Sequence, residues 1–205
     1  MARTAARHGA GSEFGGLFGL AAGVAMAVRR GRLARAVVDL AGVAPGDRVV
    51  DVGCGPGTFL REAARRGAAA TGIEPAPQMR RLAGRLTPAR LRASVTVLDG
   101  TAERIPLEDG AATVAWAVSS VHHWTDVDQG LAELRRVLAP GGRLLLTERL
   151  ARPGGWFRHH AASPQRAEEL ASRATAAGFA EVAVEQRALG RYHFVLVTGH
   201  PPATG

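Results

Sequence analysis

The sequence predicts an α/β fold with a seven-stranded, mostly parallel sheet between helices. From residue 45 onward, short β-branched or aliphatic runs alternate with longer amphipathic stretches, which is typical of repeated strand–helix–strand units. The 205 residues fit one such domain, because domains mostly run about 100–200 residues. Only a few residues around Gly190 separate the last two runs, too few for a crossover helix, so the last strand should run antiparallel.

The elements follow in chain order after a turn at Pro45–Asp47. The expected strands are Arg48–Val52, Ala69–Ile73, Ser94–Leu98, Thr113–Val118, Arg143–Thr147, Glu181–Gln186 and Tyr192–Val197. Apolar residues at three- and four-residue spacing predict the helices Thr58–Arg66, Ala76–Leu86, Val127–Leu138 and Pro164–Ala177. Helix ends favour glycine because it tolerates left-handed geometry, which fits the positions of Gly67, Gly141, Gly142 and Gly178.

The segment Phe14–Val28 is mostly apolar, but its fifteen residues are fewer than the ~20 needed to span a bilayer. We expect an N-terminal helix here that covers the active site or packs on the sheet. Residues 1–45 would form this helical cover, and residues 46–200 the core of the same domain. A signal peptide is the weaker alternative, because Glu13 and the arginines after the segment fit it poorly.

The charge and cysteine content limit which partners and metal sites the sequence can be expected to have. The chain carries 26 basic and 18 acidic residues, a net charge of +8, and every basic residue is arginine. These arginines occur in ones and twos, as on the solvated faces of amphipathic helices, which argues against a nucleic-acid stripe. The single Cys54 excludes an intrachain disulfide and a cysteine-based metal site. We therefore expect a cytoplasmic protein without a structural metal.

A glycine turn joins the first strand to the first core helix. Gly53–Gly57 contains three glycines, which allow a sharp turn and the close approach of a ligand to the backbone. Glu74 ends the second strand, 23 residues after Asp51, where a carboxylate can accept hydrogen bonds from both hydroxyls of a ribose. The alternative to a binding site is an ordinary tight turn between a strand and a helix. The turn combined with Asp51 and Glu74 favours a nucleoside site.

The spacing of the glycines separates two kinds of nucleoside. Dinucleotide sites use G-x-G-x-x-G, whereas Gly53, Gly55 and Gly57 have the spacing G-x-G-x-G. Strands before a dinucleotide turn usually carry apolar residues, but Asp51 places a carboxylate beside this turn. That charge suits the ammonium group of a bound amino acid, so a nucleoside joined to an amino acid is favoured.

Five motifs in order resemble the class I S-adenosylmethionine (SAM)-dependent methyltransferases, in particular their small-molecule group with a minimal Rossmann-like domain. The motifs are Val50–Thr58, Gly72–Pro75, Asp99–Leu107, Val121–Asp126 and Glu133–Arg143, and the resemblance covers most of Asp47–Val197. It implies a Rossmann-like three-layer sandwich and SAM as the cofactor.

The resemblance also implies roles for single residues. Asp51, Gly53 and Gly55 would face the methionine part of SAM, and Glu74 the ribose. The other implied cofactor-binding residues are Cys54, Gly57, Pro75, Met79, Thr101, Ala102, Glu103 and Ser119, with Pro75 and Met79 around the adenine and Thr101 to Glu103 at its edge. Many relatives carry an acid where Thr101 and Thr113 stand, so the adenine contact would come from a backbone amide or the Thr101 hydroxyl.

Two adjacent histidines follow the fourth strand, where the resemblance places the loop beside the cofactor sulfur. Methyl transfer from a sulfonium depends mainly on positioning, and a general base is needed only if the acceptor must lose a proton. His122 or His123 has a suitable side chain for that step. The alternative is structural: one histidine hydrogen-bonds backbone, and Trp124 anchors the next helix.

Three segments would form the acceptor pocket: Phe14–Val28, Ser119–Trp124 and the Arg149–Ser163 loop that holds His159 and His160. All three are apolar or aromatic, so we expect a small, partly hydrophobic acceptor. A SAM-dependent enzyme acting on RNA or another macromolecule, and a non-catalytic nucleoside-binding module, are the alternatives.

Overall fold

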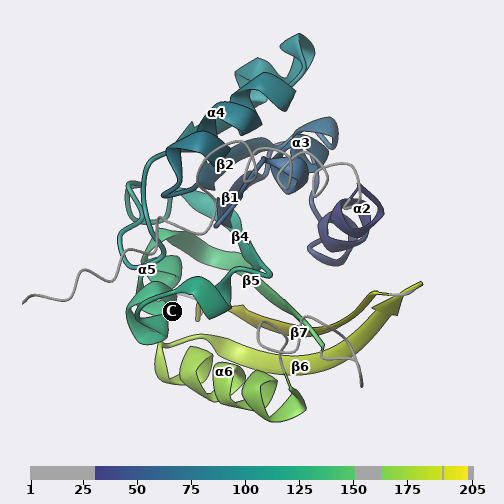
Figure 1. Ribbon diagram of the computed structural model, residues 1–205. Helices are drawn as coiled ribbons and strands as arrows, with labels where there is room; N and C mark the ends of the chain where they lie inside the picture. The colour runs from purple at the N-terminus through teal and green to yellow at the C-terminus, as the bar shows by residue number, and fades with distance from the viewer. Residues whose placement is uncertain (1–30, 151–162, 191, 203–205) are drawn as a thin grey trace, which may run out of the picture.

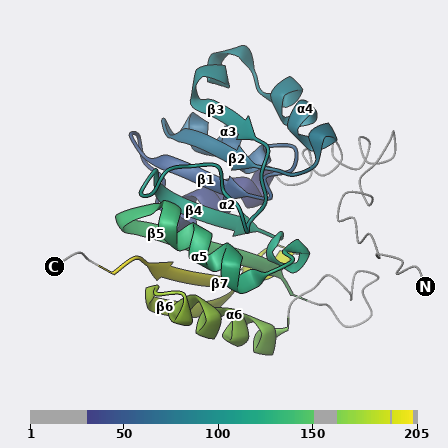
Figure 2. The same ribbon diagram turned by 90° about the vertical axis from the view of Figure 1, so that its left-hand side faces the viewer.

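The computed structural model describes residues 31–150, 163–190 and 192–202. Its centre is a seven-stranded sheet in the order β3-β2-β1-β4-β5-β7-β6 (Figure 2). The strands are β1 Arg48–Val52, β2 Ala69–Ile73, β3 Val95–Leu98, β4 Ala112–Val118, β5 Leu138–Arg149, β6 Ala180–Leu189 and β7 Tyr192–His200. Strands β1 to β5 pair in parallel with one another, and β7 is antiparallel to both β5 and β6. The predicted fold class is therefore confirmed.

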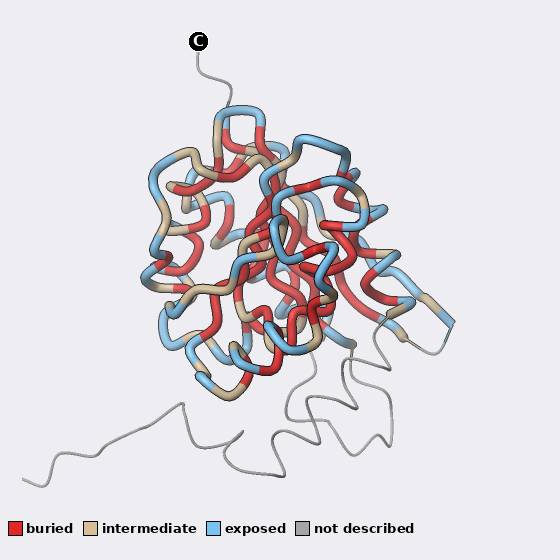
Figure 3. The backbone as a smooth tube through the Cα atoms, turned by 90° about the horizontal axis from the view of Figure 1, so that it is seen from above, coloured by how far each residue is buried: buried red, intermediate tan, exposed pale blue. Residues whose placement is uncertain are grey.

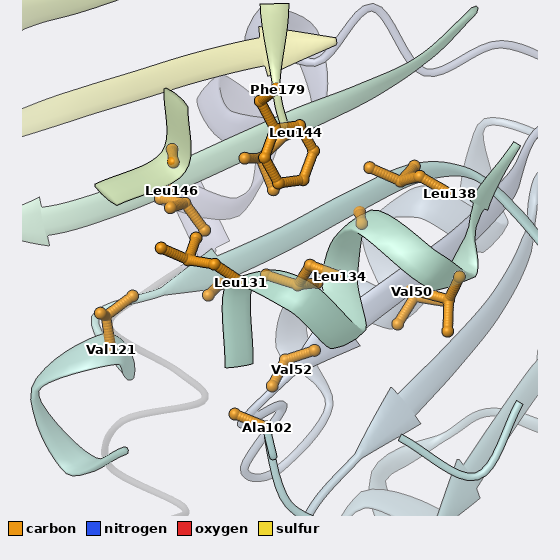
Figure 4. Close-up of a cluster of buried hydrophobic side chains, with 14 of the residues drawn as sticks. Val50, Val52, Ala102, Val121, Leu131, Leu134, Leu138, Leu144, Leu146 and Phe179 are labelled. Carbon is orange, nitrogen blue, oxygen red and sulfur yellow. The ribbon is translucent and has the colours of Figure 1, made fainter. Parts of the chain in front are cut away.

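Helices cover both faces of this sheet (Figure 1). They are α2 Gly31–Leu40, α3 Thr58–Arg65, α4 Pro77–Leu86, α5 Val127–Val137 and α6 Pro164–Ala176, with short 3-10 helices η1 Ala89–Ser94 and η2 Val121–His123. Helices α2 and α3 pack on one face in a cluster that contains Trp116, and α5 and α6 pack on the other in a cluster that contains Val50 and Val52. The second cluster is drawn in Figure 4.

Side chains that alternate between the two faces of each strand contribute to both hydrophobic clusters. Val49 joins the α2–α3 side while Val50 and Val52 join the α5–α6 side, because successive side chains of a strand point to opposite faces. Buried backbone therefore concentrates at the centre and exposed backbone at the periphery (Figure 3). A central strand buried on both faces reads as a nearly continuous apolar run, which makes the acidic side chain of Asp51 conspicuous.

The fifth strand differs from its prediction. It begins at Leu138 rather than Arg143, so Gly141 and Gly142 lie within β5 and not at the end of α5. The pairing of β4 with β5 shifts register between Ala112 and Val114, and the glycines lie in that irregular stretch. Gly141 does adopt a positive φ of +71°, whereas Gly142 does not. At the other predicted positions, Gly67 and Gly178 have φ of +84° and +89° at helix ends.

The structure describes the N-terminal part of the chain from residue 31 onward. Phe14–Val28 lies outside the described residues, and the division into a cover of residues 1–45 and a core of 46–200 stays a prediction. Within the first part, α2 buries Leu33 and Val37 against the α3 side of the sheet. Among the described residues, no helix is both long and apolar enough to cross a membrane.

Asp47 ties three elements together at the edge of the sheet opposite the glycine turn. Its carboxylate accepts from the Thr113 hydroxyl at 2.6 Å, from the Ala44 amide at 2.9 Å and from Arg143 at 2.8 Å. Burial opposes the charged form, but these hydrogen bonds and the charge of Arg143 lower the pKa of Asp47 below its ordinary value. Thr113, at the start of β4, therefore has a structural partner in Asp47.

Asp47→Asn should destabilise the protein at neutral pH by about 1.5–3 kcal/mol, the range for a lost hydrogen bond to a charged group. A lowered carboxylate pKa contributes stability above the ordinary value of 3.8, and this stability is lost as the pH falls through the native pKa. The difference in free energy of unfolding between the two proteins should therefore shrink below about pH 3.8.

Urea unfolding at pH 7 and at pH 3 measures this difference. Asp128→Asn is the matched control, because the Asp128 carboxylate is largely exposed in its ion pair with Arg173 and its removal should leave stability unchanged. Equal destabilisation by Asp47→Asn at both pH values would contradict the assignment.

Candidate active site

The turn after β1 has the backbone that the glycine spacing predicts. Gly53, Gly55 and Gly57 have φ of +76°, +52° and +73°, a region that other residues rarely adopt. The amides of Gly53 and Cys54 both donate to the Ile73 carbonyl at the end of β2, at 2.8 and 3.3 Å. The turn is thus fixed to the carboxyl end of the neighbouring strand, where ligands bind in open α/β sheets.

The first two glycines of the turn have different surroundings. A Cβ atom on Gly53 would lie 2.6 Å from the Cβ of Ser120, so Gly53 permits the loop after β4 to pack against the turn. A Cβ atom on Gly55 would meet nothing within 4 Å. The Gly55 backbone therefore borders open space that a bound group can occupy closely.

Glu74 is the buried partner of this turn. Its side chain accepts from the Gly55 amide at 2.8 Å through Oε2 and from the Ala76 amide at 2.9 Å through Oε1. Burial raises the pKa of Glu74, while the two amides and the charge of Arg80 oppose that rise. Each carboxylate oxygen can accept two hydrogen bonds, so the group has acceptor capacity left for the two hydroxyls of a ribose. The residues present therefore fit the nucleoside part of SAM.

Asp51 and Cys54 lie deeper, on either side of the beginning of the turn. Asp51 is only 1% exposed, in a strand paired on both sides. The Cys54 thiol lies against Gly72 of β2, where a Cβ atom would be 2.5 Å from its Sγ. Burial, and then the charges of Asp51 and Glu74, raise the pKa of Cys54, so its thiol stays protonated. Any contact of Cys54 with a cofactor would come from its backbone.

Arg61 is a functional candidate that the sequence analysis missed. Its guanidinium is largely buried and donates to the Pro56 carbonyl at 2.6 Å and to the Thr58 hydroxyl at 3.4 Å. Burial, and then the nearby charge of Arg65, lower its pKa. Arg61 thus braces the glycine turn from the α3 side. The sequence feature that could have identified Arg61 is its place in the first turn of a helix, a turn that contains no acid.

The predicted adenine surroundings come from α4 and from the loop after β3. Met79 is buried on α4, and Thr101 forms an isolated bridge with Arg104. Glu103 accepts from the amides of Thr125 and Asp126, at 2.7 and 3.1 Å, and so fixes the approach to α5. The Glu103 carboxylate therefore has backbone partners of its own. The remaining predicted positions lie as follows: Pro75 is exposed after β2, Ala102 is buried, and Ser119 follows β4 with a φ of +53°.

The two histidines after β4 are not equivalent. The Nδ1 atom of His122 lies 2.8 Å from Oε2 of Glu148, and Oε1 of the same carboxylate accepts from the Val121 amide at 2.9 Å. The His122 side chain is 23% exposed and that of Glu148 is 8% exposed. Both histidines are exposed residues, and their ring centroids lie 4.1 Å apart.

Glu148 was also missed by the sequence analysis. It comes from β5, where it follows a run of buried leucines, Leu144–Leu146, and Thr147. An acid within such an apolar run, at the ligand-bearing edge of a parallel sheet, is the signal that could have identified it.

Trp124 packs as an anchor, as the structural alternative predicted. A Cβ on Gly130 of α5 would lie 2.6 Å from the Trp124 ring. His159 and His160 lie outside the described residues, as does most of the Arg149–Ser163 loop. Within the described ranges, no group of three or more His, Cys, Asp or Glu side chains is placed to hold a metal ion.

Residues 50–146 match the family described as methyltransferase domain. The chain is 35% identical over 150 residues to the 27-O-demethylrifamycin SV methyltransferase of Amycolatopsis mediterranei, a match that covers 71% of this chain and 52% of that protein. It is 38% identical over 104 residues to a malonyl-acyl-carrier-protein O-methyltransferase of Serratia marcescens, which covers 50% of this chain and 38% of that one. The chain thus spans about half or less of the length of these curated relatives.

Solved structures share the fold. A SAM-dependent methyltransferase from Aquifex aeolicus superposes with a TM-score of 0.75 at 22% identity, covering 88% of this chain and 98% of that one. A cyclase, SpnF, superposes with a TM-score of 0.72 at 24% identity, over 85% of this chain and 81% of that one. The fold alone therefore does not name the reaction. The family match and the sequence relatives, together with the G-x-G-x-G turn, identify residues 50–146 of this chain as a class I SAM-dependent methyltransferase domain, whose cofactor is SAM.

Proposed function

We propose that this protein transfers a methyl group from SAM to a small, partly hydrophobic acceptor. The observation that carries the proposal is the buried acid pair Asp51 and Glu74 on either side of a turn whose Gly55 backbone borders open space. Bound SAM supplies a methyl group on a positively charged sulfur, which is a good leaving group. The protein then has to hold the nucleoside and methionine parts and present the acceptor in line.

Each of the three residues has a separate part in binding. Glu74 would accept from the ribose hydroxyls while it holds the Gly55 amide. Asp51 is fixed in a buried strand, where its charge acts through a low dielectric and attracts the ammonium of the methionine part. Gly55 would let the cofactor approach the backbone without a side chain between them.

The names of the relatives support a small acceptor. They include the rifamycin and malonyl-carrier-protein enzymes and a 2-methyl-6-phytyl-1,4-hydroquinone methyltransferase of Synechocystis that is 39% identical over 105 residues. Several arginines that raise the net charge have acidic partners, as Arg136 does with Glu133 and Asp109. The cytoplasmic setting expected from the lone Cys54 stays a prediction.

Gly55→Ala should weaken SAM binding by about tenfold or more, since a methyl group would occupy the space against the ligand and the left-handed backbone would be strained by about 1–2 kcal/mol. Gly42→Ala is the matched control. Gly42 also has a positive φ, of +59°, and open space at its Cβ, but it lies between α2 and β1.

Calorimetric titration with SAM gives the two affinities, and thermal unfolding gives the cost of backbone strain that both variants share. If Gly42→Ala weakened SAM binding as much as Gly55→Ala, the loss would come from strain and not from the cofactor site.

Asp51→Asn should reduce the affinity for SAM by about 10- to 100-fold, the range expected when a charge-assisted hydrogen bond is lost. Transfer of label from methyl-labelled SAM to a panel of small phenols, alcohols and amines should fall with it. The control Asp128→Asn removes an exposed acid paired with Arg173 and should leave both quantities unchanged.

Three outcomes would contradict the proposal. Label transfer that persists undiminished in Asp51→Asn would remove Asp51 from the site. SAM binding without transfer to any acceptor would favour a non-catalytic nucleoside-binding module. Transfer to RNA, with a steep dependence on salt, would replace the small acceptor by a nucleic acid.

A further inference from the structure

We propose that a cavity between α4 and the edge strand β3 is a binding site for a small organic anion, in which a phosphate or carboxylate group is joined to a short apolar part. This cavity is separate from the turn that would hold SAM. The inference goes beyond methyl transfer and does not depend on it.

The cavity lies at one edge of the sheet, where α4 packs beside β3 (Figure 2). Its volume is about 240 Å³, smaller than the roughly 300–1,000 Å³ of pockets that hold drug-sized molecules. The lining residues come from α4 and its C-cap, from η1 and from β3: Arg80, Gly84, Thr87, Arg92, Val95 and Val97. None of them belongs to the predicted cofactor-binding set. A ligand of this cavity would therefore be small and distinct from SAM.

Two guanidinium groups give the cavity a positive charge. Nη1 of Arg80 donates to the carbonyls of Glu74 and Pro75, both at 2.8 Å, and also pairs with Asp99 at 2.8 Å. Within the described ranges, Nε and Nη2 of Arg80 have no hydrogen-bond partner, and Arg92 has no ion pair. The planar fork of a guanidinium matches the oxygens of a phosphate or a carboxylate. Donors for an anion are thus present on two sides of the cavity.

The chain around the cavity carries no acid that could neutralise these arginines. Residues 75–98 contain five arginines and neither aspartate nor glutamate. Asp99, which pairs with Arg80, lies just after this stretch, and its side chain is 73% exposed. The sequence analysis treated the arginines as isolated and solvated, but the fold brings α4 and η1 to the same cavity. An excess of one charge in a cleft attracts small ions of the opposite charge.

The floor of the cavity is apolar. Val95 and Val97 are two residues apart on β3, so their side chains point to the same face of the sheet. Both are only partly buried where they pack against the α2–α3 cluster. A bare phosphate ion would contact the arginines and leave the valines in water, whereas an anion with a short apolar part would cover both. The lining therefore favours an organic anion over an inorganic one.

Gly84 is the feature that points to a ligand rather than to packing. A glycine inside a helix destabilises it relative to alanine. Gly84 does not have the positive φ that would require glycine, and a Cβ atom on it would meet nothing within 4 Å. Neither the backbone nor a neighbouring side chain thus explains a glycine here. Its effect is to leave the cavity open along the wall formed by α4.

An NMR titration of the ¹⁵N-labelled protein with phenyl phosphate, at constant ionic strength, tests the site. The backbone amide signals of Gly84, Thr87 and Val95 should shift and saturate at millimolar concentrations. Inorganic phosphate should bind more weakly because it does not cover the valines. Phenol, which has the ring but no charge, should leave these signals unchanged.

Two substitutions separate the cavity from the general charge of the protein. Arg92→Gln should weaken phenyl phosphate binding by about fivefold or more. Gly84→Leu should abolish the saturable shifts by filling the cavity, while the melting temperature stays the same or rises, because leucine favours a helix more than glycine does. Arg85→Gln is the matched control: it removes the same charge from α4 but does not line the cavity, and it should bind as the wild type does.

Four results would overturn the proposal. They are absence of any shift at millimolar phenyl phosphate, shifts of equal size with phenol, equal weakening by Arg92→Gln and Arg85→Gln, and undiminished binding by Gly84→Leu. Binding to vesicles that contain phosphatidic acid, without binding of free phenyl phosphate, would indicate a membrane surface instead and would also overturn it.

The test is independent of the proposed methyl transfer. The NMR titration contains no SAM and no acceptor, so failure of SAM binding or of label transfer would leave its result standing. Arg92→Gln and Gly84→Leu should both leave the Kd for SAM unchanged, since neither residue lies in the cofactor turn. A parallel loss of SAM affinity in both variants would show that the cavity is part of the cofactor site, and would overturn the proposal of a separate one.

Discussion

The hydrogen bond from the Gly55 amide to the buried Glu74 carboxylate is the interaction on which the site depends. It joins the ends of β1 and β2 through a turn that three glycines make possible, and it places an acid and an open backbone surface side by side. Burial of Glu74 costs free energy, which its amide partners offset. The rest of the fold supports this arrangement: Arg61 braces the turn from α3, and Ser120 closes against Gly53 from the loop after β4.

Parallel strands explain why residues distant in the sequence meet here. Asp51, Glu74, His122 and Glu148 come from four successive stretches of the chain, yet β1, β2, β4 and β5 all end at one edge of the sheet. Under the proposed function, the two acids near the turn would bind the cofactor, whereas the acid on β5 contacts the Val121 amide and the His122 ring. The carboxylates thus act in different ways according to what each of them faces.

The positions of the strands along the chain could be predicted from the sequence because periodicity and glycine spacing are local signals. The turn Gly53–Gly57 and the acid at Glu74 were found, and the antiparallel hairpin followed from the short link at Gly190. The early start of β5 was missed, because it depends on a register shift against β4 that no local pattern records. Arg61 and Glu148 were missed for the same reason. Their roles arise from partners in other elements, Pro56 and the histidine loop, and an arginine or acid alone does not reveal a buried partner.

The central claim is that this glycine turn, with its two acids, holds SAM. Calorimetric titration of the wild-type protein with SAM and, separately, with NAD tests it most directly, because both ligands contain an adenine nucleoside but only SAM carries the methionine ammonium that Asp51 would attract. The account predicts saturable binding of SAM with little or no binding of NAD. Tight binding of NAD without binding of SAM would contradict it.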